Sequence, residues 1–167
     1  MFKNKKSLQK VDLKKVMFIS SMGGHLSELQ MLDFKKYDYC IVTEESDSDK
    51  DLKQKYPESR VFFLKYGTRK TPIKYFFILL YNLFKSMQLY FKLKPEVIVT
   101  TGTHTAVPMC YIAKIFGSKI IWIETFANKN SKTLAGRLVY PIANTFVVQW
   151  EDMLKLYPKA VYWGWIY

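Results

Sequence analysis

The chain has 167 residues, of which 49% are hydrophobic and 17% aromatic, and it carries a formal net charge of +12. This length and composition indicate one domain with enough apolar material for a core, and they exclude general disorder. The two cysteines, Cys40 and Cys110, lie in apolar segments without metal-ligand spacing. We therefore expect buried thiols in a reducing compartment.

The chain begins with a basic arm over residues 1–14, and a single domain is expected over residues 15–167. The arm has the charge of a signal peptide but lacks its apolar stretch, so the protein is expected to stay in the cytoplasm. Its lysines indicate a polyanionic partner, either a lipid surface or a nucleic acid.

A glycine turn follows the first expected strand, residues 16–20, and leads into leucines at helical spacing. Without a Cβ, Gly23 and Gly24 let backbone N–H groups approach a ligand at the start of the helix, which favours an anion or a hydroxyl-rich group. A dinucleotide fingerprint fails because His25 and Glu28 stand where it needs glycines, and no GK[ST] follows for a P-loop. The alternative is a tight turn whose His25 only caps the helix.

The rest of the chain alternates between strand-like and helix-like segments. Strands are expected at residues 38–43, 60–65, 96–100, 119–123 and 145–149, and helices at 25–35, 72–94, 105–116 and 131–140. This alternation predicts an α/β fold with a Rossmann-like, doubly wound parallel sheet. The acidic segment 44–51 is expected to be a solvated loop, because its DxD-like Asp47-Ser48-Asp49 arises easily by chance in so acidic a run.

In a 3-2-1-4-5 strand order, ligands bind above the carboxyl ends of strands one and four. This order places the glycine turn opposite the loop at residues 100–108. The next strand brings Glu124 to the same edge.

The expected helix at 72–94 is strongly apolar, but lysines interrupt it too often for a membrane span. One apolar face is expected to pack on the sheet and consists of Ile73, Phe76, Phe77, Leu80, Phe84, Met87 and Phe91. Lys74, Lys85 and Lys92 share another face with apolar neighbours, a pattern typical of helices at a membrane interface. The alternative is a helix covered by another part of the protein or by a subunit.

Four segments carry a resemblance to a known family: TTGTHTAVPMCYIAK, IIWIETFAN, TLAGRLVYPIANTFVVQW and YPKAVYWG. They resemble the acceptor-binding subunit of the split UDP-N-acetylglucosamine transferase of dolichol-linked glycan assembly, and most closely its bacterial capsular-polysaccharide counterparts. The resemblance implies the N-terminal half of a GT-B glycosyltransferase, with a separate small protein as the nucleotide-sugar half. It further implies transfer from a UDP-sugar to a polyprenyl-diphosphate-linked acceptor in capsular or exopolysaccharide biosynthesis, without a metal cofactor.

On this resemblance, the acceptor's phosphates or sugar are assigned to residues of the turn and of the opposite loop: Ser21, Gly23, Gly24, Thr101, Gly102 and Thr103. His104 is grouped with them, although the family loop is expected to carry small residues there. Inverting transfer needs a base for the acceptor hydroxyl. His25 is the first candidate, because histidine is partly deprotonated near neutral pH. Glu124 is the second, as base or as a clamp for a hydroxyl.

Two further surfaces are assigned to partners. Eukaryotic members of the family carry an N-terminal transmembrane helix, and we expect the lysine arm to take its place here. Together with Lys74, Lys85 and Lys92, the arm is expected to hold the protein peripherally on the cytoplasmic face of the plasma membrane. The C-terminal residues Trp163, Trp165, Ile166 and Tyr167 are expected to dock the nucleotide-sugar subunit, since Trp163 completes an edge strand and an apolar terminus follows it. The alternative is that this terminus folds back on the chain's own core.

Two other classes of function compete with the transferase subunit. A noncatalytic membrane scaffold would need only the basic arm and the amphipathic helix. A nucleic-acid binder ranks third, because the aromatic residues fall largely on expected core positions and no RNP, KH or zinc pattern is present.

Overall fold

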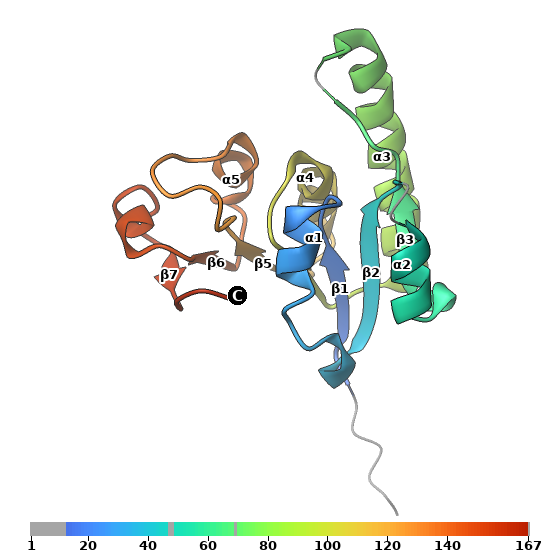
Figure 1. Cartoon of the computed structure of the whole chain (residues 1–167), viewed down its shortest axis with the longest axis horizontal. Helices are drawn as coiled ribbons and strands as arrows, with labels where there is room; N and C mark the ends of the chain where they lie inside the picture. Colours follow the sequence, from blue (N-terminus) through green and yellow to red (C-terminus); the bar gives the residue numbers. More distant parts are fainter. Residues whose placement is uncertain (1–12, 47–48, 69, 167) are drawn as a thin grey trace, which may run out of the picture.

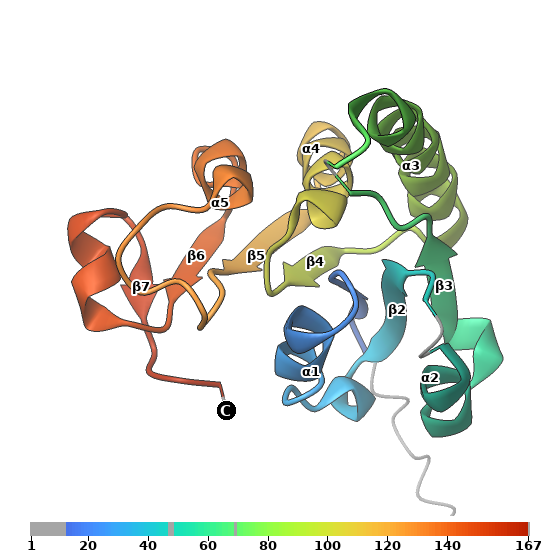
Figure 2. The ribbon, with the colours of Figure 1, turned by 45° about the horizontal axis from the view of Figure 1, so that its top comes forward.

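A computed structural model describes residues 13–46, 49–68 and 70–166. Its seven strands form one parallel sheet in the order β3-β2-β1-β4-β5-β6-β7 (Figures 1 and 2). They are β1 (Lys15–Ile19), β2 (Asp38–Glu44), β3 (Val61–Leu64), β4 (Val97–Thr100), β5 (Lys119–Ile123), β6 (Thr145–Val148) and β7 (Val161–Tyr162). The strand order reverses beside β1 and β4, so the predicted doubly wound, Rossmann-like fold is confirmed.

Helices cover both faces of the sheet (Figure 2). One face carries α3 (Pro72–Leu93), α4 (Val107–Ile115) and α5 (Leu134–Val139), and the other carries α1 (Gly24–Leu29) and α2 (Asp49–Lys55). Successive side chains of a strand point to opposite faces. Accordingly, Met17 and Ile19 of β1 join the core beneath α3 to α5, whereas Phe18 joins the core beneath α1 and α2.

Two helical segments differ from their predicted bounds. The helix expected to run to residue 35 ends at Leu29, and after a turn a short 3-10 helix, Phe34–Lys36, brings Phe34 against Phe18 with ring centroids 4.2 Å apart. The helix expected from residue 131 begins at Leu134, because the Thr133 hydroxyl caps it by accepting from the Gly136 N–H at 2.8 Å.

The acidic segment 44–51 was predicted to be a loop, and this prediction is wrong in its second half. Helix α2 begins at Asp49, and its Leu52 is 5% exposed within the core beneath α1 and α2. Burying one large apolar residue anchors a short polar helix that has little propensity of its own. Asp47 and Ser48 of the DxD-like pattern lie outside the described residues.

Helix α3 has nearly the predicted bounds, but the prediction of its packing face is wrong. Every residue expected to pack on the sheet is exposed: Ile73, Phe76, Phe77, Leu80, Phe84, Met87 and Phe91. The buried residues are Asn82, Ser86, Leu89 and Tyr90.

Polar contacts hold this buried side of α3. Asn82 accepts from the Lys65 N–H at 2.9 Å and donates to the Lys65 carbonyl at 2.8 Å, and the Tyr90 hydroxyl lies 2.6 Å from Ser118 Oγ. Two small polar residues, Asn82 and Ser86, thus allow the helix to lie close to the sheet, while its apolar face points outward.

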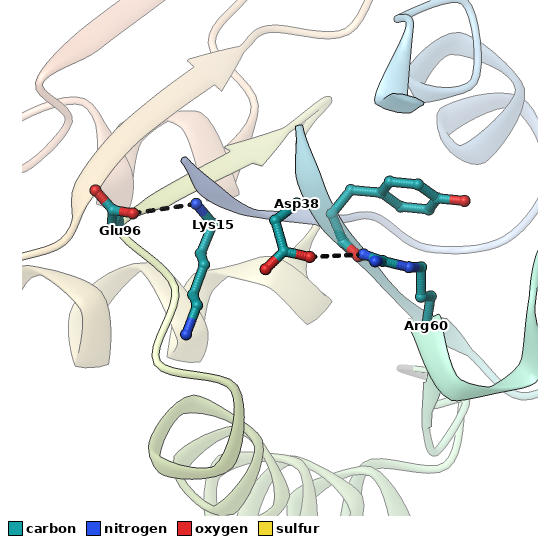
Figure 3. Close-up of polar contacts among 5 residues, drawn as sticks. Lys15, Asp38, Arg60 and Glu96 are labelled. Carbon is teal, nitrogen blue, oxygen red and sulfur yellow. Dashed lines mark hydrogen bonds and ion pairs between the residues drawn. The ribbon is translucent and has the colours of Figure 1, made fainter. Parts of the chain in front are cut away.

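Polar contacts join the amino ends of β1 to β4 in two pairs (Figure 3). The backbone N–H of Lys15 donates to Glu96 Oε1 at 3.1 Å, which ties β1 to the start of β4. Arg60 donates to Asp38 Oδ1 at 2.8 Å and to the Tyr39 carbonyl at 2.6 Å, which ties β2 to the start of β3. These contacts lie at the end of the sheet opposite the one where the fold places ligands.

Both cysteines are free thiols, with Cys110 buried and Cys40 half-buried. Burial raises the pKa of each thiol to about 12. Nucleophilic and metal-binding roles require the ionised thiolate. Neither thiol is ionised near neutral pH, so neither is suited to such a role.

Candidate functional site

The glycine turn after β1 and the loop after β4 meet at the carboxyl edge of the sheet, as predicted. Strands β1 and β4 are paired, with Ile19 beside Thr100, so their continuations leave the sheet side by side. Gly23 and Gly102 have φ values of +77° and +96°, in the region that favours glycine. A Cβ on Gly23 would meet nothing within 4 Å, so the backbone of the turn faces open space.

His25 and Thr101 hold the two segments together through a reciprocal pair of hydrogen bonds. His25 Nδ1 lies 3.0 Å from the carbonyl oxygen of Thr101, and the Thr101 hydroxyl donates to the carbonyl oxygen of His25 at 2.7 Å. A carbonyl oxygen only accepts, so Nδ1 carries the proton in this contact. In the neutral ring, Nε2 then keeps a free lone pair. A general base needs such a lone pair to accept a proton.

A hollow of about 460 Å³ opens beside His25, within the size range of ligand pockets. Its lining residues come from the carboxyl ends of β1 to β4: Ser21, Met22, His25, Glu44, Tyr66, Gly67, Thr68, Thr103 and His104. The structure thus brings together four residues that the sequence analysis assigned to the site, namely Ser21, His25, Thr103 and His104. The lining is rich in hydroxyl, imidazole and carboxylate groups, which suits a hydroxyl-rich ligand.

Thr103 has a strained backbone within this lining. Its φ is +91°, and a positive φ is exceptional for a β-branched residue. Such conformations cost about 1–3 kcal/mol and gather at functional sites. Among the described residues, its buried Oγ1 has no hydrogen-bond partner. Strain and an unpaired hydroxyl in the same residue favour a binding role for this loop.

Glu44 also lines the hollow, although the sequence analysis did not assign it to the candidate site. It is 2% exposed at the end of β2, accepts a hydrogen bond from the Thr105 hydroxyl, and lies 3.8 Å from His104 Nε2. The ring of Tyr75 also lies near His104, at a centroid distance of 5.6 Å. A polar residue at the carboxyl end of a central strand was the available signal, but Glu44 had been grouped with the acidic loop.

Glu124 lies at the predicted edge but does not line the hollow. It is 2% exposed, and its Oε2 accepts from the Trp122 indole N–H at 2.9 Å. It packs beneath α5, where a Cβ on Gly136 would stand only 2.4 Å from Oε2. Its roles as base or hydroxyl clamp stay predictions, and the geometry favours His25.

Glu28 is a second buried carboxylate that the sequence analysis did not assign to the site. It lies on α1 three residues after His25, is 2% exposed, and accepts from the Phe126 N–H at 3.0 Å and from the Gln149 amide. Burial raises the pKa of Glu28, while these hydrogen bonds and the nearby His25 oppose that shift. The carboxylate thereby ties α1 to the segment after β5.

The residues assigned to a membrane lie on α3. Lys74 and Lys92 are exposed, and Lys85 is half-buried. The Nζ atom of Lys92 lies 5.5 Å from the centroid of the Phe62 ring. No helix in the described part of the chain is long and apolar enough to cross a membrane. Residues 1–12 of the basic arm lie outside that part.

The C-terminal residues assigned to a partner fold back along the chain's own surface. The Trp165 ring meets Phe126 and Trp150 at centroid distances of 5.4 and 5.1 Å, and the Ile166 N–H donates to Gln149 Oε1 at 3.1 Å. Trp163 and Trp165 are nonetheless 67% and 57% exposed. Tyr167 lies outside the described residues.

Metal ligation was not expected, and the described residues contain no group of three or more His, Cys, Asp or Glu side chains placed to hold an ion. The absence of a metal cofactor stays a prediction.

Comparison with known proteins shows what this arrangement is similar to. The family described as "Oligosaccharide biosynthesis protein Alg14 like" matches residues 6–166. The UDP-N-acetylglucosamine transferase subunit ALG14 of Mus musculus is 24% identical over 177 residues, covering 90% of this chain and 82% of that protein. The subunit alg14 of Schizosaccharomyces pombe is 29% identical over 185 residues, covering 96% and 87%.

Solved structures with a similar fold are larger proteins. MurG of Acinetobacter baumannii superposes with a TM-score of 0.63 at 16% identity, covering 81% of this chain and 41% of MurG. UDP-N-acetylglucosamine 2-epimerase of Rickettsia bellii gives a TM-score of 0.70 at 15% identity, covering 92% and 45%. The chain therefore spans less than half the length of these structures and corresponds to one Rossmann-like half of a GT-B fold.

Proposed function

The chain belongs to the family of Alg14-like oligosaccharide biosynthesis proteins, and from this premise we propose that it is the acceptor-binding half of a two-component inverting glycosyltransferase. The donor is a UDP-sugar, and the acceptor is a glycan linked to polyprenyl diphosphate. The relatives described above are eukaryotic, so the closer kinship to bacterial capsular proteins and the capsular or exopolysaccharide setting stay predictions.

The observation that carries the proposal is the orientation of His25 by Thr101 at the rim of a polar hollow. With its proton on Nδ1, His25 presents Nε2 to a hydroxyl of the acceptor. As that oxygen attacks the anomeric carbon, Nε2 takes its proton, the bond from the anomeric carbon to the UDP oxygen breaks, and UDP leaves as an anion. Groups that stabilise the departing UDP belong to the other half of the cleft.

We expect that other half to be a separate nucleotide-sugar subunit. A GT-B cleft lies between two domains, and this chain supplies one of them. The exposed Trp163 and Trp165 are the proposed docking residues, because exposed tryptophans commonly dominate protein interfaces. Deleting residues 165–167 should abolish pull-down of that subunit, and unchanged affinity of a folded truncated chain would refute the assignment.

The outer face of α3, α4 and α5 supports attachment to an anionic membrane. Together these helices carry five basic residues and no acidic one: Lys74, Lys85, Lys92, Lys114 and Arg137. The exposed apolar side of α3 continues across Tyr111 of α4 to Leu138 of α5, over a groove of about 570 Å³. Large exposed apolar patches mark interaction surfaces, and basic charge suits anionic lipid.

This face adjoins the hollow, because His104 lines both the apolar groove and the hollow. Tyr75 of α3, which lies near His104, lines the groove as well. A lipid-linked acceptor could thus keep its chain in the bilayer while its sugar reaches His25.

We propose peripheral attachment at the cytoplasmic face of the plasma membrane. In a flotation assay, the fraction of protein bound to anionic vesicles should decrease as the ionic strength is raised. It should also decrease when Lys74, Lys85 and Lys92 are changed to glutamate. Equal binding to neutral and anionic vesicles would contradict the proposal.

The test of the catalytic assignment is His25→Ala in the complex with the nucleotide-sugar subunit. Loss of a general base should lower kcat by about 10² or more at saturating acceptor. Ser27→Ala is the control, since Ser27 is exposed on the same helix. Unchanged kcat for His25→Ala would remove the base assignment, with Glu124 as the next candidate, and would favour the alternative of a noncatalytic membrane scaffold.

A further inference from the structure

Gln149 joins three segments of the chain through one buried amide. It follows β6 and is 1% exposed. Its Nε2 donates to the carboxylate of Glu28 and, at 3.1 Å, to the backbone carbonyl of Glu124. Its Oε1 accepts from the Ile166 N–H at 3.1 Å. Both hydrogens and the oxygen of the amide are therefore in use.

Each of these partners belongs to a segment of the proposed site. Glu28 lies one helical turn after His25 on α1, and it also holds the Phe126 N–H. Ile166 follows Trp165, whose ring packs on Phe126. The helix that carries His25, the segment after β5 and the C-terminal segment thus converge on Gln149.

The chemistry of the position restricts it to an amide. A side chain here must donate to a carboxylate and a carbonyl while accepting from a backbone N–H. A glutamate would set a second carboxylate against Glu28, and an apolar residue would leave Glu28 and the Ile166 N–H without this buried partner, which is costly.

We infer that Gln149 is a positioning residue for His25, which keeps α1 where Nδ1 reaches the Thr101 carbonyl. Since Ile166 binds the same amide, the placement of His25 also depends on the C-terminal segment. The importance of His25 rests on the proposed function, but its orientation can be measured without any transfer assay.

The chain contains only two histidines, His25 and His104, so both rings can be followed by nitrogen NMR. At about pH 8, above the ordinary pKa of histidine, long-range proton–nitrogen spectra show which ring nitrogen carries the proton. In the wild-type chain, His25 should be present as a single Nδ1-protonated form. In Gln149→Met it should lose that single form and show the Nε2-protonated tautomer as well.

Two controls separate positioning from general destabilisation. His104 is the internal control, because it lies beside Glu44 and does not contact Gln149 or Glu28 through any hydrogen bond among the described residues. Asn82→Leu is the matched variant, since it removes another buried amide with bonds to both backbone groups of Lys65. In Asn82→Leu the His25 signal should stay as in the wild type.

A folded Gln149→Met chain that keeps the single Nδ1-protonated His25 would overturn the inference. If circular dichroism shows that this variant does not fold, deletion of residues 165–167 decides, because it removes the Ile166 N–H. A moved His25 signal with an unmoved His104 signal would then support the inference, and an unmoved His25 signal would overturn it. If transfer fails in the wild-type complex while these shifts occur, the proposed function fails and the positioning role stands.

Discussion

Thr103 shows how a single residue stores strain at the edge of the hollow. Its φ of +91° suits glycine better than threonine. Thr103→Gly should therefore raise the free energy of unfolding by about 1 kcal/mol, a part of the usual cost of such strain, as measured by urea denaturation. Thr68→Gly is the control, since Thr68 also lines the hollow but has no positive φ. This control variant should be less stable than the wild type. Equal destabilisation of both variants would show that Thr103 is not strained.

Glu28 should make the stability of the chain depend on pH. Burial raises its pKa above the ordinary value of 4.5, so the folded state binds this proton more tightly than the unfolded state does. The contribution of the group to stability is then fully present below pH 4.5 and is lost as the pH rises through the folded-state pKa.

The variant Glu28→Gln cannot titrate, so its free energy of unfolding relative to the wild type should rise over that pH interval. Urea denaturation at several pH values measures the difference. Glu45→Gln, the same change at an exposed position, is the matched control. A constant difference for Glu28→Gln would exclude the raised pKa.

At the residue scale, local sequence signals predict only part of the candidate site. The turn at Gly23 and Gly24 and the helix that carries His25 were predictable, because a strand, a glycine turn and a helix follow one another directly. Gln149 was not, because its partner Glu28 is 121 residues away and nothing local marks either as buried. A buried polar network becomes visible only when the sheet order has brought its members together.

At the element scale, α3 separates what periodicity can predict from what it cannot. The spacing of apolar residues gave the helix within one residue at its end, because it reflects the helical repeat itself. It could not say which face meets the sheet. The sequence did not mark Asn82 as a buried residue, because its hydrogen bonds are made with the backbone of Lys65, outside the helix.

The exposed face of α3 leads to a stability prediction. Phe77 and Phe84 are 63% and 58% exposed, so Phe77→Ser and Phe84→Ser should each change the free energy of unfolding by less than about 0.5 kcal/mol. Leu89→Ala is the matched contrast at 3% exposure and should cost about 2–5 kcal/mol. Denaturant titration distinguishes the two cases. The two Phe variants should also weaken vesicle binding, whereas a large loss of stability would mean that this face packs on the sheet.

At the scale of the whole molecule, the sheet order was predictable because alternating strands and helices admit few parallel arrangements. The predicted place of the site followed from that order, since the turn after β1 and the loop after β4 must meet. The partner did not follow from the fold. It is proposed from the family, because the relatives ALG14 and alg14 are each named as a subunit of a UDP-N-acetylglucosamine transferase.

The central claim is that this chain is half of a transferase, and reconstitution tests it most directly. The purified chain, and the chain co-expressed with its nucleotide-sugar subunit, are each given radiolabelled UDP-sugars and a polyprenyl-diphosphate-linked acceptor in the presence of EDTA. We predict that label reaches the acceptor only with the complex, because one domain cannot form the cleft. Transfer by the chain alone, or none by a stable complex with any UDP-sugar, would contradict the account.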